Sequence, residues 1–299
     1  MTATQSESAH AKINLYLHVT GRRADGYHLL DSVAVFAGAA DVLDVEVAQA
    51  HGGALGLRID GMFGAGLCGD DATNLVIRAA DALRARAGEG GRPLPSLDAV
   101  LHKDLPVASG IGGGSADAAA ALRTVMKAWG MTVPRDELVR IATALGADVP
   151  VCLDQAPTRM SGIGEILRPA PVLPQCGMML VNCGMSVSTP AVFRARKGGF
   201  RPAPDLPARW ETLSQMVGTL SELSNDLEDA ACAVCPTIRD VLSAMRAAPG
   251  CRFARMSGSG ATCFALFDTP QAAELARDAV ERPGWWVWAG DLYRGGCAA

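Results

Sequence analysis

The sequence predicts a mixed fold of helices and strands organised in two domains. In the first half, strand patterns, loops and helical patterns follow one another, which is typical of α/β or α+β proteins. The composition changes after Leu153, because residues 154–175 are rich in proline and glycine. A chain of 299 residues is also longer than most single domains. We therefore expect a domain boundary near residue 154.

The composition excludes several classes of protein. Hydrophobic residues make up 49% of the chain and charged residues 19%, so the chain can bury a sizeable core and is not disordered. The net charge of −4 leaves no basic field for a nucleic acid or an anionic membrane, although a small basic pocket for a phosphorylated ligand is compatible with it. No apolar run approaches the roughly 18–20 residues that span a bilayer.

The cysteines and the start of the chain predict a cytoplasmic protein. Residues 1–12 are polar and carry no apolar segment typical of a secretory signal. The nine cysteines are an odd number and are scattered along a long chain, so we expect reduced thiols rather than disulfides. Cys232 and Cys235 lie in an apolar stretch with helical spacing, which indicates core residues rather than a zinc or redox site.

The individual elements follow from local periodicity and capping signals. One helix has Thr73 or Asn74 as its N-cap, and another begins at Pro134 and ends at Gly146. The strands expected in the first half cover residues 11–20, 27–47 with a turn near 37–41, and 97–102, and the helices cover 73–87, 115–129 and 134–146. The second half is expected to hold strands at 178–183, 252–256, 261–267 and 286–293, and helical segments after 189–190 and at 210–221, 225–248 and 270–281.

The glycine-rich segment 106–123, PVASGIGGGSADAAAALR, is the strongest local signal. Its glycines let the backbone approach a ligand closely, and the helix after it would point unpaired N–H groups at the same place, which predicts a phosphate site. The Walker A, Rossmann and protein-kinase patterns are all absent. The alternative is a turn that only packs a helix against a strand. The predicted phosphate loop comprises Pro106, Val107, Ala108, Ser109, Gly110, Ile111, Gly112, Gly113, Gly114, Ser115 and Ala116.

Two further segments support a catalytic interpretation. Residues 255–267, RMSGSGATCFALF, hold a second Gly/Ser turn between apolar strands, which by itself could be an ordinary β-turn. In residues 145–153, LGADVPVCL, Asp148 follows a helix end and precedes an apolar segment that we expect to be a strand. An acid at that position is either a turn former or a base that faces a cleft.

Taken together and in this order, the three segments resemble the GHMP kinase family of small-molecule kinases. Residues 11–33, AKINLYLHVTGRRADGYHLLDSV, and the motifs DATNLVIRAA, GIGEIL and SNDLE narrow the resemblance to the branch that acts on cytidine diphosphate methylerythritol. The similarity runs from about residue 9 to about residue 267. One departure is Ala116, which stands where the branch commonly has a second serine.

The resemblance implies an α+β fold with two domains, residues 1–154 and 155–299. The first would resemble the second domain of ribosomal protein S5, the second would be ferredoxin-like, and the active site would lie between them. The implied activity is ATP-dependent phosphorylation of the substrate's 2-hydroxyl in the non-mevalonate isoprenoid route, with ATP and Mg²⁺ as cofactors. The expected partner is this small molecule, with no nucleic acid or membrane, and the chain would be a monomer or a homodimer.

Roles for the catalytic residues also come from the resemblance. Asp148 would accept the proton of the substrate hydroxyl, and Lys12 would keep that aspartate ionised and stabilise the transferring phosphoryl group. Judged without the family, Lys12 would be an ordinary surface lysine at a strand start. Asn14 lies two positions further on the same strand face, so we expect it to contact the substrate.

Residues that bind the two substrates are implied in the same way. Tyr27 would stack on the cytosine, His28 would hydrogen-bond it, Phe193 would supply the opposing ring, and Thr189 would join the substrate site. Asn74 and Lys103 would lie on the adenine side. The alternatives are that Tyr27 and Phe193 are half-buried packing residues, that Asn74 is only a helix N-cap, and that Lys103 is only an edge-strand charge.

Three other functions are alternatives to this assignment. The first is another GHMP kinase, which the DGYH tetrad argues against because it suits a substrate that carries a nucleotide. The second is a nucleotide-binding oxidoreductase, which the failed Rossmann spacing argues against. The third is a non-catalytic binding protein of the same fold, which the presence of both Lys12 and Asp148 argues against.

Overall fold

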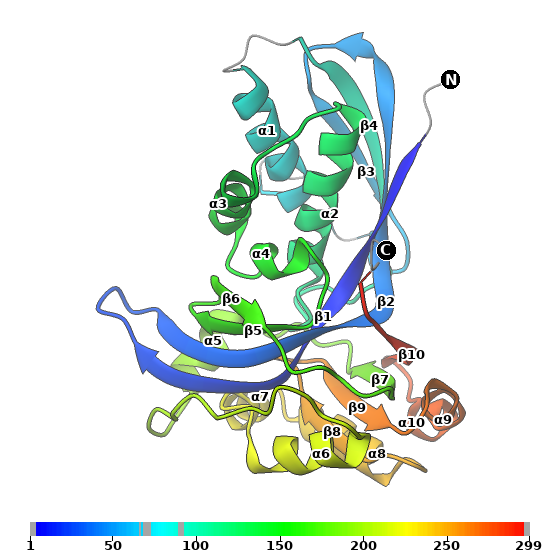
Figure 1. The fold of residues 1–299 in the computed structure, drawn as a ribbon. Coiled ribbons are helices and arrows are strands. Elements are labelled where there is room, and N and C mark those ends of the chain that lie inside the picture. Colours follow the sequence, from blue (N-terminus) through cyan, green and yellow to red (C-terminus); the bar gives the residue numbers. More distant parts are fainter. Residues whose placement is uncertain (1–3, 66, 68–72, 89–92, 296–299) are drawn as a thin grey trace. The chain divides into compact units, whose positions relative to one another are not determined.

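The computed structural model describes residues 4–65, 67, 73–88 and 93–295, and its chain forms two compact units (Figure 1). Unit 1 comprises Met1–Ala11, Ala40–Val107 and Gly113–Asp154. Unit 2 comprises Lys12–Ala39, Ala108–Gly112 and Gln155–Ala299. One boundary between the units lies after Asp154. Two earlier segments, Lys12–Ala39 and Ala108–Gly112, also belong to unit 2. The domain boundary predicted at residue 154 therefore stays a prediction.

Unit 1 combines strands with a group of helices. Strand β4 (Pro95–His102) pairs in parallel with β3 (Leu55–Asp60) and antiparallel with the second half of β2 (His28–His51). Helices α1, α2 and α3 contact one another, and α1 also contacts β3 (Figure 1). The helices of this unit are α1 (Leu75–Gly88), α2 (Gly113–Ala128), α3 (Arg135–Leu145) and α4 (Val149–Cys152).

The helix starts in unit 1 follow their local chemistry. Asn74 caps α1, because its Oδ1 accepts a hydrogen bond from the Val76 N–H at 2.9 Å. Helix α2 begins at Gly113, two residues before the predicted start. The apolar segment after Asp148 is the short helix α4 and not the predicted strand. Pro150 has no N–H to donate to a strand ladder, whereas the first turn of a helix needs none at that position.

Unit 2 is built on an antiparallel sheet. In this sheet the first half of β2 pairs with β10, β10 with β7, β7 with β9, and β9 with β8. A further strand, β5, pairs with β2 and β6. The strands are β5 (Thr158–Gly162), β6 (Ile166–Pro169), β7 (Gly177–Asn182), β8 (Phe253–Met256), β9 (Cys263–Phe267) and β10 (Trp286–Tyr293). Strand β1 (Gln5–Arg22) contributes residues to both units.

The prediction of a turn near residues 37–41 is wrong, because strand β2 continues through these residues without a break. The small residue Gly38 suggested a turn. In the fold, a Cβ at Gly38 would lie 3.0 Å from the ring of Trp288, a neighbour across the sheet. A larger side chain at position 38 would collide with this ring. Close packing across the sheet, and not a reversal of the chain, therefore accounts for the glycine.

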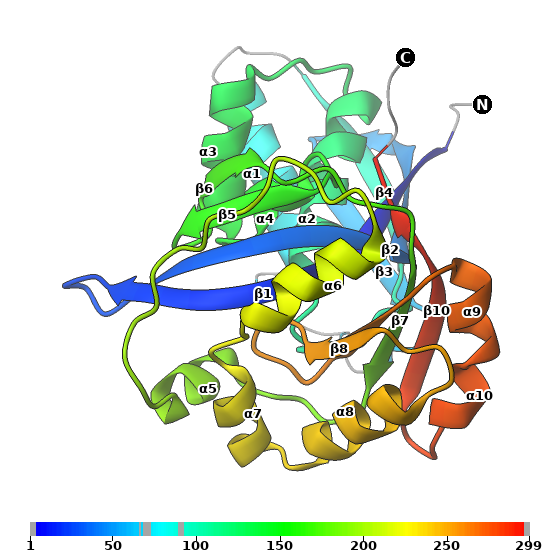
Figure 2. The same cartoon turned by 60° about the horizontal axis from the view of Figure 1, so that its bottom comes forward.

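Helices pack on the sheet of unit 2, with α7 to α10 along one side of its strands (Figure 2). The helical segment predicted at 225–248 is broken into α7 and α8 at Pro236, because proline removes a hydrogen-bond donor and clashes with the preceding turn. The helices are α5 (Thr189–Ala195), α6 (Leu213–Glu222), α7 (Glu228–Val234), α8 (Thr237–Ala247), α9 (Pro270–Leu275) and α10 (Arg277–Val280).

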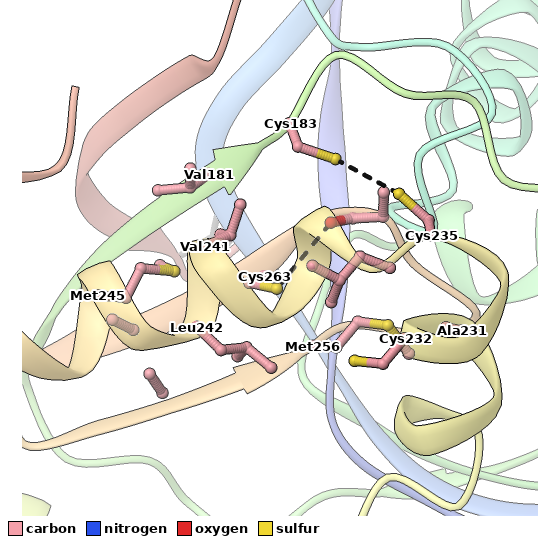
Figure 3. Packing of buried hydrophobic residues seen from close by; sticks show 14 of the residues in the cluster. Val181, Cys183, Ala231, Cys232, Cys235, Val241, Leu242, Met245, Met256 and Cys263 are labelled. Carbon is pink, nitrogen blue, oxygen red and sulfur yellow. Dashed lines mark hydrogen bonds between the residues drawn. The ribbon is translucent and has the colours of Figure 1, made fainter. Parts of the chain in front are cut away.

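The core of unit 2 is rich in sulfur. Cys183, Cys232, Cys235 and Cys263 are buried there among apolar side chains of β7, α7, α8 and β9 (Figure 3). The expected core placement of Cys232 and Cys235 is confirmed. The seven cysteines within the described ranges are all free, and Cys68 and Cys297 lie outside those ranges. Among the helices that the structure describes, none has the length and apolar character needed to cross a membrane.

Candidate active site

Lys12 is buried beside the middle of the glycine-rich loop. Its backbone N–H donates a hydrogen bond to the Ile111 carbonyl at 2.8 Å, and a Cβ at Gly112 would lie 3.3 Å from the Lys12 side chain. Lys12 is only 4% exposed, so it is not the surface lysine that its sequence context alone would suggest. In unit 2 the loop therefore runs along strand β1 at the predicted catalytic lysine.

The second Gly/Ser turn, residues 257–260, packs against the same loop. A Cβ at Gly110 would lie 2.7 Å from backbone atoms of Gly260 and Ser257, and Gly110 has φ +76°. Ser257 Oγ donates a hydrogen bond to the Gly110 carbonyl at 3.2 Å, and the Thr262 N–H donates to the Ser109 carbonyl at 3.0 Å. Glycine is required at this position because any side chain would strain φ and clash with backbone.

Asn14 is oriented by hydrogen bonds within unit 2. Its Nδ2 donates to Ser32 Oγ at 2.7 Å, and its backbone N–H donates to Ser257 Oγ at 3.1 Å. Ser32 Oγ in turn donates to the Tyr16 carbonyl at 2.5 Å. The Asn14 amide is thus held in one orientation, with its Oδ1 on the side of Gly258.

In unit 1, the loop continues into α2 beside a buried group of charges. The Lys103 ammonium donates to Asp41 and, at 2.6 Å, to Asp117, and all three side chains are almost fully buried. Burial opposes the charge of Lys103, but attraction to Asp117 and Asp41 outweighs it and raises the pKa of the ammonium. Lys103 is therefore not an exposed edge-strand charge.

The same group fixes the start of α2. Asp41 Oδ1 accepts hydrogen bonds from the N–H groups of Asp104 and Leu105, at 2.7 and 2.8 Å. A Cβ at Gly113 would lie 3.2 Å from Lys103 Nζ. Pro106 is buried and Val107 is exposed, just before the loop residues that belong to unit 2. Gly114 is exposed, Ser115 is half-buried and Ala116 is buried in the first turn of α2.

Asp148 stands at the N-cap position of α4 in unit 1 and is half-buried. Its side chain makes no capping hydrogen bond to that helix, so capping does not account for this carboxylate. Lys12 belongs to unit 2, and its pairing with Asp148 stays a prediction.

The predicted cytosine-binding residues lie in unit 2. His28 and Phe193 stack on each other, with ring centroids 4.9 Å apart and planes 20° apart. Tyr27 is 62% exposed, so it is not a half-buried packing residue. Burial lowers the pKa of His28, and the nearby charges of Arg22 and Arg196 lower it further. Thr189, at the start of α5, shares a hydrogen bond of 2.7 Å with Ser259 of the second turn.

The structure thus groups the predicted residues by unit. In unit 2 it brings Lys12, Asn14, residues 108–112 and the turn 257–260 together, and it stacks His28 on Phe193. In unit 1 it places Lys103 beside Gly113, while Asn74 acts as a helix cap. The sequence identified the second turn as a motif, but it did not identify Ser257 and Ser32 as residues whose hydrogen bonds orient Asn14 and the glycine-rich loop. The Gly/Ser pattern of the turn was the available signal for Ser257, whereas no local pattern marked Ser32.

Comparisons with known proteins assign the chain to a family. The model of the GHMP kinases N terminal domain matches residues 74–161, and that of the GHMP kinases C terminal domain matches residues 206–284. A 4-diphosphocytidyl-2-C-methyl-D-erythritol kinase of Gluconacetobacter diazotrophicus is 64% identical over 98% of this chain and 96% of its own length. The corresponding kinase of Granulibacter bethesdensis is 51% identical over 96% of this chain and 94% of its own length.

Solved structures agree with this assignment. A crystal structure of 4-(cytidine 5'-diphospho)-2C-methyl-D-erythritol kinase superposes with a TM-score of 0.76 at 32% identity, covering 98% of this chain and 100% of that one. The homoserine kinase of Cytophaga hutchinsonii, at 18% identity and TM-score 0.69, covers 99% of this chain and 97% of its own and shares the fold. The expected fold is confirmed, and the chain belongs to the GHMP kinase family of small-molecule kinases, in its 4-diphosphocytidyl-2-C-methyl-D-erythritol kinase branch.

Proposed function

We propose that this ATP-dependent kinase transfers the γ-phosphoryl group of ATP to the 2-hydroxyl group of 4-diphosphocytidyl-2-C-methyl-D-erythritol. This is the step of the non-mevalonate isoprenoid route that the names of its relatives describe. The relatives match this chain almost from end to end, which supports the same substrate. The geometry of the site supports phosphoryl transfer.

The observation that carries the proposal is the buried Lys12 beside the glycine-rich loop. A glycine-rich loop that leads into a helix N-terminus presents backbone N–H groups to phosphate. A cationic side chain at that loop can neutralise negative charge as the phosphoryl group moves. Phosphoryl transfer asks mainly for such positioning and charge neutralisation.

The remaining chemistry is assigned to Asp148. The acceptor hydroxyl is a weak nucleophile, and a carboxylate that accepts its proton in the transition state makes it a better one. Asp148 stands half-buried at the N-cap position of α4.

Mg²⁺ would accompany the nucleotide. Within the residues that the structure describes, no three His, Cys, Asp or Glu side chains gather into a metal site. Mg²⁺ is commonly bound through nucleotide phosphates, waters and only one or two protein oxygens. The half-buried Ser115 at the start of α2 has an oxygen of this kind. When bound, Mg²⁺ would neutralise charge on the phosphates.

The cytidine end of the substrate would occupy the side of Tyr27, His28 and Phe193. An exposed Tyr27 ring offers a face for base stacking. A cytoplasmic location, where thiols stay reduced, is proposed with this function. A monomer or a homodimer is the proposed state of assembly.

The test is a coupled assay of ADP release with purified chain. We expect ATP turnover with the cytidine substrate and none above background with galactose, homoserine or mevalonate. Phosphorus NMR of the product should show a new phosphomonoester at the 2-position. Turnover with one of the other three alcohols, without turnover of the cytidine substrate, would overturn the proposal.

A further inference from the structure

Asn225, from the SNDLE motif, donates hydrogen bonds to two backbone carbonyls at the second Gly/Ser turn, residues 257–260. Its Nδ2 donates hydrogen bonds to the Met256 carbonyl at 2.9 Å and to the Gly258 carbonyl at 2.8 Å. Its Oδ1 accepts one from the Leu227 N–H at 3.0 Å. Asn225 is 6% exposed, so both amide donors and the amide oxygen have partners in a buried place.

The turn that Asn225 holds is the surface on which the glycine-rich loop rests. A Cβ at Gly258 would lie 2.7 Å from the Gly110 carbonyl oxygen, and a Cβ at Gly110 would lie 2.7 Å from Gly260 and Ser257. Ser257 links the two segments by its hydrogen bond to the Gly110 carbonyl. With backbone against backbone, the turn cannot shift without moving Gly110.

We infer that Asn225 is a positioning residue for nucleotide binding, which acts through the turn 257–260 on Gly110 of the phosphate loop. The inference rests on the proposed function in one respect, since it takes residues 106–116 as the loop that holds ATP. The side-chain amide of Asn225 bonds to the turn and to Leu227, so we place its effect on the nucleotide in the turn.

The amide is the group that this position needs. Two buried carbonyls must find donors, and one side-chain NH₂ supplies both. An aspartate of the same shape would keep the acceptor for Leu227 but turn a carboxylate oxygen toward two carbonyl oxygens. The turn would then have to shift to relieve the repulsion between these oxygens. A displacement of this kind at a loop that positions a reactant lowers binding and rate strongly.

The experiment compares Asn225→Asp and Asn225→Ser with the matched control Ser224→Ala. Asn225→Ser keeps an oxygen for the Leu227 N–H and is the variant to use if Asn225→Asp fails to fold. Ser224 is the adjacent residue, and its hydroxyl donates to Asp226 rather than to the turn. Circular dichroism and thermal unfolding establish that each variant is folded. Calorimetry measures binding of adenosine 5'-(β,γ-imido)triphosphate, and steady-state kinetics give KM for ATP and for the cytidine substrate.

We expect the folded Asn225 variants to bind the ATP analogue about tenfold more weakly or worse, with a matching rise in KM for ATP. KM for the cytidine substrate should rise less than KM for ATP, and Ser224→Ala should resemble the unmodified chain. An unchanged affinity for the analogue, or an equal rise in both KM values, would overturn the inference. The binding measurement needs no phosphoryl acceptor, so it stands even if the unmodified chain fails to phosphorylate the cytidine substrate.

Discussion

Asp148 is the residue on which the proposed chemistry depends most. We predict that Asp148→Asn lowers kcat by about 10²- to 10⁴-fold, because an amide cannot accept the hydroxyl proton. Affinity for the ATP analogue should stay unchanged, since the loop is not altered. The matched control is Asp154→Asn, in which an exposed carboxylate paired with Arg135 is removed a few residues away. A kcat near that of the control would contradict the assignment of Asp148 as base.

Tyr27 and His28 are predicted to select the cytosine base. Tyr27→Ala should raise KM for the cytidine substrate about tenfold, because stacking on an aromatic ring contributes about 1–3 kcal/mol per base. KM for ATP should not change. His28→Ala should reduce the preference for the cytidine substrate over its uridine analogue, measured as the ratio of kcat/KM values, because a mismatched base edge leaves a buried group unpaired. Equal rises in both KM values for Tyr27→Ala, or an unchanged ratio for His28→Ala, would place these residues outside the base site.

The protonation of His28 gives a separate prediction. Burial lowers its pKa, and Arg22 and Arg196 lower it further, so the imidazole is neutral at neutral pH. KM for the cytidine substrate should therefore be constant above neutral pH and rise only on acidification below the ordinary imidazole pKa of about 6.5. His28→Asn should remove that rise. An acid-induced rise of the same size in the variant would mean that another group titrates.

At the scale of elements, the contact between the glycine-rich loop and the turn 257–260 can be tested by adding one methyl group. Gly110→Ala would place its Cβ 2.7 Å from backbone atoms of Gly260 and Ser257, at a φ of +76°. The unfavourable φ alone costs about 1–2 kcal/mol. We therefore predict that the folded variant binds the ATP analogue at least about tenfold more weakly.

Gly218→Ala, in α6, is the matched control outside the loop. A Cβ at this exposed residue would meet no atom within 4 Å. Alanine is favoured over glycine in a helix by up to about 1 kcal/mol, so the control should be as stable as the unmodified chain or more so. If both variants lost nucleotide affinity equally, the contact of Gly110 with the turn would not be the cause.

At the scale of the whole molecule, the buried charge group of unit 1 couples stability to pH. Burial raises the pKa of Asp117 to about 7 from 3.8, against the attraction of Lys103 and with a further rise from Asp41. At pH values between 3.8 and about 7, Asp117 is therefore protonated in the folded chain and ionised in the unfolded chain. The stabilisation that this proton contributes is thus present below about pH 4 and lost as the pH rises to about 7.

We predict that this coupling disappears in Asp117→Asn. Between about pH 5 and pH 7, the free energy of unfolding of the unmodified chain should fall by about 1 kcal/mol per pH unit relative to the variant. Denaturant titrations at several pH values measure it, and Asp98→Asn on β4, an exposed carboxylate, is the control. Parallel pH profiles for the unmodified chain and Asp117→Asn would show that Asp117 does not titrate in this range.

Much of this protein could be predicted from the sequence alone. Most strands and helices, the cap at Asn74, the core placement of Cys232 and Cys235, and the family follow from local patterns. Local patterns suffice there because periodicity, capping groups and glycine-rich turns act over a few neighbouring residues. The glycine-rich loop was recognisable for the same reason.

Only the tertiary structure decided which of these local features serve the fold and which serve the site. Gly38 was expected in a turn, but it lies in a strand beneath Trp288, a residue 250 positions away in the chain. Lys12 and Lys103 had the sequence context of surface lysines, but both are buried, and Lys103 lies between two aspartates. The demand for glycine at Gly110 comes from the backbone of Gly260. Each of these outcomes depends on contacts between segments that are distant in the sequence. A local sequence pattern does not indicate which distant residues will pack against it in the folded chain.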